Sequence, residues 1–263
     1  MLIEHSLALM FKKFELTLTV VENIKLNNSF FKLVLTHSEP LPAMVPGQFV
    51  EVKVENTPTV YLRRPISIND VDYKANTLSL IIKNVGDGTN ALSKLLAGSS
   101  VNLLLPLGNG FTLIEKGEAL LVGGGVGIAP LLYLGKKLRS NGVKVTYLLG
   151  FKVKSDLIDL SAFKSVGEVM ITTEDGSVGV KGFVTGHQCI KRHYDMMYVC
   201  GPTPMMKNVA KEAIATGTEC EVSLENMMAC GLGACLGCVT QTKEGHKCVC
   251  SDGPVFNINE LVW

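Results

Sequence analysis

The stretch LLVGGGVGIAPLLYL, residues 120–134, passes from an apolar run through a glycine-rich turn into a helical pattern. This order is typical of nucleotide-binding α/β domains, in which backbone N–H groups at the start of a helix meet phosphate. The turn contains Gly123, Gly124, Gly125 and Gly127, which is not the G-x-G-x-x-G fingerprint. Taken alone, the stretch is therefore equally compatible with a plain tight turn.

Strand-length apolar runs and helical patterns continue to alternate after this stretch, which predicts a Rossmann-like domain with a parallel sheet over residues 113–219. We expect strands at 119–122, 143–149, 169–172 and 197–200, and helices at 128–140 and 205–216. The motif YVCGPTPMM, residues 198–206, repeats the strand–turn–helix design. It would place Cys200, Gly201 and Pro202 at the carboxyl edge of the sheet, where ligands bind in open α/β sheets.

Residues 13–112 have a different rhythm, with short alternating runs punctuated by Pro and Gly, and this predicts an antiparallel β-barrel. We expect strands at 14–21, 30–36, 48–54, 61–68, 78–83 and 100–105, with one helix at 90–96. Residues 1–12 form an N-terminal extension to which the sequence assigns no role.

Two motifs of the barrel region favour a flavin dinucleotide. In RRPISI, Arg64 suits a pyrophosphate, and Ser67, two residues past Pro65, can reach the edge of an isoalloxazine ring. Farther along, Gly88 and Thr89 precede a helix, so their N–H groups would meet an anion. Singly, the arginine reads as a solvated charge and the Gly-Thr pair as an ordinary cap. Together, and in this order, they favour a dinucleotide.

The last region, residues 220–263, is too small to build a core alone and concentrates cysteine. The spacing C-x4-C-x2-C is that of the plant-type [2Fe–2S] run, and its glycines would let backbone N–H groups approach sulfur. A structural zinc site is the alternative, although zinc usually takes two C-x2-C pairs. The cysteines concerned are Cys230, Cys235 and Cys238, with either Cys248 or Cys250 as the fourth ligand.

Composition excludes several function classes. The chain has 263 residues with a net charge of +1, which provides no field to recruit nucleic acid or an anionic membrane. Its apolar runs are too short to span a bilayer, and its start lacks the features of a signal peptide. Eight cysteines in that context predict a cytoplasmic, reducing location. No Ser/His/Asp or paired-carboxylate arrangement is evident, so we expect no catalytic residue beyond the cofactors themselves.

The motifs in their order resemble the ferredoxin–NADP reductase superfamily: Arg-Pro-Ile-Ser, Gly-Thr, GGGVGIAP and CGPTPMM. With CGLGACLGC, CSDGPVF and TEDGSVGVKGFVT added, the chain from about residue 13 resembles the electron-transfer subunits of class 1B dihydroorotate dehydrogenases. The combination is specific, although each motif is not.

This resemblance implies three cofactor sites. FAD would contact Arg64, Pro65, Ile66, Ser67, Ile81, Ile82, Lys83, Gly88 and Thr89. NAD would lie on Gly123, Gly124, Gly125, Gly127, Cys200, Gly201 and Pro202, with Cys200 near the nicotinamide. A [2Fe–2S] cluster would take Cys230, Cys235, Cys238 and Cys250, because the last ligand of the family directly precedes a DGPVF-like run.

The resemblance also implies an FMN-containing partner subunit that oxidises dihydroorotate, in a heterotetramer with two copies of each chain. Electrons would pass from FMN through the cluster and FAD to NAD+ in pyrimidine (UMP) biosynthesis. Two rival interpretations stay open: a FAD/[2Fe–2S] subunit of another NAD(P)H-dependent ferredoxin oxidoreductase, and a zinc-stabilised nucleotide-binding module. Redox potentials, the choice of NAD over NADP and the role of Cys248 do not follow from the sequence.

Overall fold

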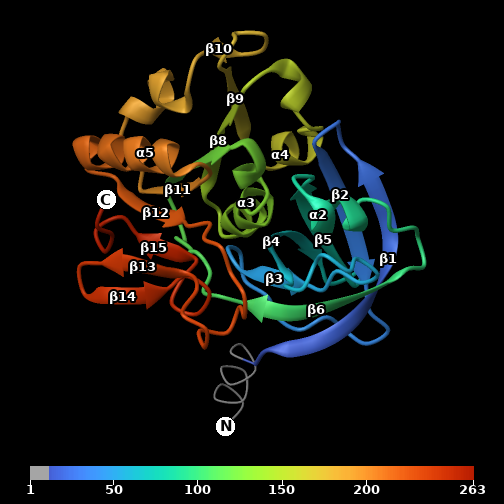
Figure 1. Cartoon of the computed structure of the whole chain (residues 1–263). Coiled ribbons are helices and arrows are strands. Elements are labelled where there is room, and N and C mark those ends of the chain that lie inside the picture. Colours follow the sequence, from blue (N-terminus) through green and yellow to red (C-terminus); the bar gives the residue numbers. More distant parts are fainter. Residues whose placement is uncertain (1–11) are drawn as a thin grey trace.

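The computed structural model describes residues 12–263 and contains a closed barrel and a larger sheet that lie side by side (Figure 1). The expected N-terminal extension, residues 1–12, lies outside the described residues except for Lys12. No helix among the described residues is both long and apolar enough to cross a membrane.

The barrel follows from the alternation in its strands, which turns every second side chain inward. Leu33 and Leu35 of the second strand are fully buried in its core, for example. The strands are β1 (Phe14–Lys25), β2 (Phe30–Thr36), β3 (Phe49–Val52), β4 (Arg64–Asp72), β5 (Thr77–Lys83) and β6 (Ser100–Leu107), closed in the order β1-β2-β5-β4-β3-β6. All neighbouring pairs are antiparallel, so the predicted antiparallel barrel is confirmed.

The helix of the barrel region, α2 (Asp87–Leu92), begins three residues before the predicted start and ends four residues before the predicted end. The Thr89 hydroxyl accepts hydrogen bonds from the N–H groups of Val85 (2.9 Å) and Gly86 (3.2 Å). This local cap fixes the first turn of the helix earlier than its apolar pattern indicates.

The second sheet is mostly parallel, as predicted, and has the order β10-β9-β8-β7-β11-β12-β15. Its strands are β7 (Glu118–Gly124), β8 (Lys144–Phe151), β9 (Glu168–Thr173), β10 (Val180–Lys181), β11 (Met196–Cys200), β12 (Glu219–Ser223) and β15 (Val255–Asn257). Only β15 runs antiparallel to its neighbour. The helices that cover it are η1 (Gly125–Ile128), α3 (Leu131–Ser140), α4 (Ser161–Val166) and α5 (Thr203–Thr216), with shorter turns η2 (Lys154–Asp156), η3 (Val184–Gly186) and η4 (Gln188–Lys191).

Strand β12 lies at the expected boundary between residues 219 and 220, and β15 extends the same sheet from near the end of the chain. The cysteine-rich residues 224–254 are therefore a long insertion between two sheet strands. The insertion contains one hairpin, β13 (Val239–Thr242) and β14 (Gly245–Cys248). In Figure 1 it is the red and orange segment beside β15.

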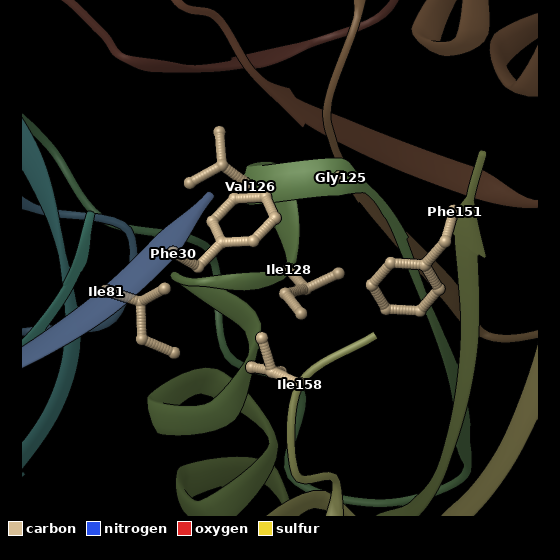
Figure 2. A pocket seen from close by; sticks show the side chains of 7 residues that line it. All are labelled: Phe30, Ile81, Gly125, Val126, Ile128, Phe151 and Ile158. Atoms are coloured by element: carbon tan, nitrogen blue, oxygen red, sulfur yellow. The ribbon is translucent and has the colours of Figure 1, made fainter. Parts of the chain in front are cut away.

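The barrel and the sheet domain are joined by buried polar contacts. The Asn69 side chain donates to the carbonyl of Ala129 (2.8 Å), and the Tyr133 hydroxyl donates to the carbonyl of Met44 (2.9 Å). An apolar seam lies beside these contacts. In Figure 2 side chains from β2, β5, η1, the end of β8 and the loop after η2 surround it, namely Phe30, Ile81, Val126, Ile128, Phe151 and Ile158.

The two glycine turns of the sheet domain meet at its carboxyl edge. Cys200 lies opposite Gly123 in the register of β11 and β7. A Cβ on Gly127 would lie 2.7 Å from the Cα of Gly201 and still closer to the Cys200 carbonyl. The missing side chain of Gly127 therefore allows the two turns to touch.

We predict that Gly127→Ala lowers the free energy of unfolding by about 1–3 kcal/mol, the usual cost of overpacking a closed contact. Urea denaturation measures this change. The control is Gly186→Ala, because nothing lies within 4 Å of the added methyl group; it should change stability by less than about 0.5 kcal/mol. Equal midpoints for the two variants would show that the turns have room for a side chain.

Candidate cofactor sites

The hairpin β13–β14 brings distant cysteines together. Val239 lies opposite Cys248 in the hairpin, and the N–H of Val249 donates to the carbonyl of Cys238 (3.2 Å). The thiols of Cys238 and Cys250 consequently lie beside one another. The thiols of Cys230 and Cys235 form a second pair in the preceding loop.

Each of these four sulfur atoms accepts a hydrogen bond from a backbone N–H. The donors are Leu232 to Cys230 (3.3 Å), Gly237 to Cys235 (3.4 Å), Cys250 to Cys238 (3.3 Å) and Gly233 to Cys250 (3.1 Å). Such bonds stabilise thiolates and tune the potential of a cluster. The backbone donors expected from the sequence are thus present around all four sulfurs.

The loop owes this geometry to left-handed backbone conformations at Gly231 (φ 66°), Gly233 (φ 82°) and Leu236 (φ 58°). The sequence predicts such freedom at Gly231, Gly233 and Gly237, and the first two use it, whereas Gly237 does not have a left-handed backbone. Leu236 takes the third left-handed position, immediately before Gly237, and a leucine there is strained. The exposed side chain of Leu236 points to a role at the surface of the loop.

The electrostatics of the loop differ between its two pairs. Donation from the N–H of Leu232 is the main cause that lowers the pKa of Cys230 to about 6, which favours the thiolate that a metal needs. Burial raises the pKa of Cys250. A positively charged metal would offset that penalty, because thiolates bind as anions.

The donor set fits a binuclear cluster better than a single ion. Two thiol pairs supply two thiolates for each of two irons. The x4 spacing between the first two cysteines also differs from the two C-x2-C pairs that zinc usually takes.

Cys248 is close to this set but differs from it. Its thiol lies beside Cys238, and its own N–H donates to the carboxylate of Asp252 (2.6 Å). Among the described residues, its sulfur accepts no backbone N–H. Cys250 therefore has the surroundings of a ligand, and Cys248 those of a buried thiol.

The barrel residues expected at a flavin also come together. A Cβ on Gly88 would lie 2.8 Å from Nε of Arg64, so the guanidinium group rests on the start of α2. The same group donates to the carbonyl of Leu62 (2.8 Å). Pro65, Ile66 and Ser67 continue along β4, half-buried.

The flavin residues predicted on strand β5 differ from those of β4 in that two of their side chains are buried in packing. Ile81 packs into the interdomain seam of Figure 2, and Ile82 is part of the barrel core. Their side chains are committed to packing, so their backbone groups are what they can offer to a ligand. Lys83 is exposed. The Thr89 hydroxyl is likewise used within its own turn.

The carboxyl edge of the sheet gathers the second set of predicted residues. Gly123 and Gly124 end β7, Gly125 and Gly127 belong to η1, and Cys200, Gly201 and Pro202 lead from β11 into α5. Gly125 is left-handed (φ 57°), and nothing lies within 4 Å of the Cβ that it lacks. Cys200 is fully buried, and burial raises its pKa, so it is a neutral thiol.

Sequence reasoning missed three residues near these sites. Ser223 lies opposite Cys200 at the end of β12, and it opposes the rise that burial causes in the pKa of that thiol. Glu225 is exposed, yet desolvation by the surrounding protein raises its pKa, with Lys83 opposing the shift. Glu225 follows the last residue of β12 by two positions, a signal that could have identified it. Glu51 of β3 gave no such signal, because a polar residue is ordinary in an alternating strand.

Comparison with known proteins separates the remaining interpretations. Residues 225–262 match the iron-sulfur cluster binding domain of dihydroorotate dehydrogenase B, and residues 15–111 match the oxidoreductase FAD-binding domain. These matches confirm a FAD-binding domain and an iron–sulfur domain with the C-terminal cysteines.

Two curated relatives carry the name dihydroorotate dehydrogenase B (NAD(+)), electron transfer subunit. The protein from Shouchella clausii is 41% identical over 255 residues, which cover 93% of this chain and 97% of the relative. The protein from Lysinibacillus sphaericus is 42% identical over 245 residues, which cover 90% and 94%.

Solved structures share the fold. An NADH-dependent reduced ferredoxin–NADP oxidoreductase, studied for flavin-based electron bifurcation, has a TM-score of 0.84 and is 30% identical, covering 94% of this chain and 90% of that chain. The ferredoxin reductase of carbazole 1,9a-dioxygenase has a TM-score of 0.67 at 19% identity, covering 79% and 67%. The ferredoxin oxidoreductase alternative thus shares the architecture, but the curated relatives are more similar in sequence. The chain belongs to the family of electron transfer subunits of the NAD-dependent dihydroorotate dehydrogenase B.

Proposed function

We propose that this chain conducts electrons from an FMN-bearing catalytic subunit to NAD+, with a [2Fe–2S] cluster and FAD as its resident carriers. The observation that carries the proposal is the arrangement of four thiols in two pairs, each thiol with its own backbone N–H donor. When bound, the cluster supplies one-electron transfer and the flavin supplies both one-electron and hydride transfer. The task of the chain is to place and tune these groups.

In this proposal Cys230, Cys235, Cys238 and Cys250 hold the cluster. The N–H groups of Leu232, Gly233 and Gly237 point at the sulfurs and stabilise negative charge on them. The low pKa of Cys230 favours the thiolate that binds iron at neutral pH.

The FAD site would combine Arg64 with the start of α2. The position of the guanidinium on Gly88 supports this, because an anion there would meet both the arginine and the N–H groups of Gly88 and Thr89. Pro65, Ile66 and Ser67 would follow the flavin along β4, and residues 81–83 would offer backbone groups.

The NAD site would lie at the carboxyl edge of the sheet, on Gly123, Gly124, Gly125, Gly127, Cys200, Gly201 and Pro202. The open space at Gly125 supports close approach of a ligand to the backbone. Because burial keeps Cys200 neutral, its role would be to pack beside the nicotinamide rather than to act as a base or nucleophile.

The face of the cysteine loop would receive the catalytic subunit that the family name implies. Met227, Leu232 and Leu236 are exposed at 90%, 46% and 65%, and they belong to the same segment of the chain as the exposed Cys235. Apolar side chains gathered on one loop are typical of an interaction surface. A tetramer with two copies of each subunit follows from the family resemblance. The location in this proposal is the reducing cytoplasm, where thiolates stay available to hold a cluster.

The choice of fourth ligand predicts different behaviour for two neighbouring thiols. Cys250→Ala should lose the cluster, because the sulfur that accepts the Gly233 N–H disappears. Cys248→Ala should keep it. Iron and sulfide content of the purified variants measures the difference, and loss of the cluster in the Cys248 variant alone would reverse the assignment.

The FAD site predicts a specific role for one of two adjacent arginines. Arg64→Ala should remove a charge-assisted contact of about 1.5–3 kcal/mol and weaken FAD binding roughly ten- to a hundredfold. Arg63→Ala is the control, since that guanidinium already bonds Asn102 (2.6 Å) and Glu15 (2.9 Å). FAD titration of deflavinated protein measures both. Equal affinities would return Arg64 to the role of a surface charge.

The proposed function itself is tested by separating its two halves. The isolated chain should oxidise NADH with an artificial dye but should not oxidise dihydroorotate. Adding the FMN subunit should give NAD+-dependent orotate formation. Cys235→Ser should abolish that coupled activity while NADH–dye activity survives, because the FAD and NAD sites do not include Cys235. Orotate absorbance and dye reduction are the measurements, and coupled activity without a cluster would overturn the electron path.

A further inference from the structure

Glu51 is a buried carboxyl group without a partner. Its side chain has no exposed surface, and neither carboxyl oxygen has a hydrogen-bond partner within residues 12–263. Val50 and Val52, its neighbours on β3, point into the barrel core. By the alternation of the strand, Glu51 points out of the barrel. An orphaned buried carboxyl group is costly and calls for an explanation.

The outer side of Glu51 is covered by the cysteine loop. A Cβ on Gly231 would lie 2.8 Å from Cγ of Glu51 and 3.3 Å from its Oε1. The carboxyl group is therefore packed against the residue that follows Cys230. On the barrel side, Glu51 lies opposite Pro65 in the register of β3 and β4, within the strand proposed to hold the flavin. Glu51 thus lies at the junction of the two proposed carrier sites.

The charges around Glu51 do not neutralise it. The cations that act on Glu51 are Arg64, which begins β4, and Arg63, which precedes it; on the facing loop Cys230 acts in the opposite direction. Arg63 donates to the backbone carbonyl of Glu51 (3.3 Å), while its other nitrogen bonds Glu15 and Asn102. Burial outweighs both arginines and raises the pKa of Glu51 to about 7.

We propose that Glu51 lowers the reduction potential of the cluster held by the cysteine loop. This inference rests on the proposed function. A carboxylate buried behind Gly231 has little solvent to screen it, so its charge opposes the arrival of an electron on the neighbouring group. The couple concerned is the gain of one electron by the oxidised cluster, supplied by a reductant. A lower potential on the cluster favours passage of that electron onward to the flavin.

The test is a redox titration of the full chain loaded with both cofactors. Mediator dyes carry the electrons, and the cluster is followed by visible absorbance and electron paramagnetic resonance. The titration is repeated at several pH values from about 6 to 9, because burial raises the pKa of Glu51 and only the ionised carboxylate carries the charge. Glu51→Gln, which keeps the shape and removes the charge, should make the cluster about tenfold easier to reduce, or about 59 mV for a one-electron couple. Glu51→Asp, which keeps the charge, should stay nearer the wild type.

Glu55→Gln is the matched control. Glu55 belongs to the same segment but is exposed, and it pairs with Lys53 at the surface (3.2 Å), so its charge is screened. Its removal should leave the potential unchanged. If Glu51→Gln does not take up two irons per chain, Glu51→Met replaces it in the titration. Glu51→Met also removes the charge, so it should shift the reduction potential of the cluster in the same direction. Without cofactors, the charge-free Glu51 variants should unfold at a higher temperature than the wild type, because they lack the buried unpaired carboxyl group. A change in stability alone would not change the reduction potential of the cluster.

The outcomes separate this inference from the function beneath it. A wild-type chain without an iron–sulfur spectrum contradicts the proposed function. A wild-type cluster whose potential equals that of the charge-free Glu51 variants overturns the role of Glu51 and leaves the function standing. An equal shift in Glu55→Gln would also overturn it, because the effect would then belong to net charge rather than to the buried site.

Discussion

The position of the cysteine loop depends on one side chain at the end of the barrel. Asn109 follows β6 by two residues, and its side chain donates to the carbonyls of Asp252 (2.9 Å) and Ser251 (3.2 Å), while its N–H donates to Gly253 (2.6 Å). These three acceptors come directly after Cys250. Because a hydrogen bond tolerates only a few tenths of an ångström of stretch, the segment that carries this thiol cannot drift from the barrel. Electron carriers need such fixed placement, since the protein contributes position rather than acid–base chemistry.

The same principle explains the contacts between the barrel and the sheet domain. The buried side chains of Asn69 and Tyr133 donate hydrogen bonds to backbone carbonyls across the interface. At the rim of the interface, Lys136 pairs with Asp70 (2.5 Å). Buried polar contacts have strict geometry, and breaking one partner leaves an unsatisfied group. These bonds therefore tie strand β4 and the segment before α3 together across the interface.

Much of this architecture could be predicted from local patterns. The alternation of FFKLVLT predicts β2 with its observed bounds, because one face of that strand is buried and the other is not. The pairing of β12 with β15 could not be predicted, since it joins residues more than thirty positions apart and both strands are short. The helix expected at 128–140 is divided into η1 and α3 around Pro130, whose missing N–H makes it a natural start for the second.

The same limit applies within the sites. Cys230, Cys235 and Cys238 lie within one short stretch of the chain, so their spacing can be seen in the sequence and is enough to predict a cluster. The distinction between Cys248 and Cys250 needs the N–H of Gly233, fifteen or more residues away, and the environment of Glu51 needs Gly231, which is farther still. Contacts of this kind arise only when the chain is folded.

What distinguishes one reaction from another in this architecture must lie outside the shared core. A structure named for a ferredoxin–NADP oxidoreductase follows nearly the whole chain at a TM-score of 0.84, although the curated relatives act in dihydroorotate oxidation. A barrel, a nucleotide edge and a cysteine loop can therefore serve different electron donors. Under the proposed function, the donor is selected where electrons enter, at the exposed Met227, Leu232 and Leu236 of the segment that contains Cys235. The strained backbone of Leu236 is consistent with this, because it turns an apolar side chain outward at the place where a partner would meet the cluster.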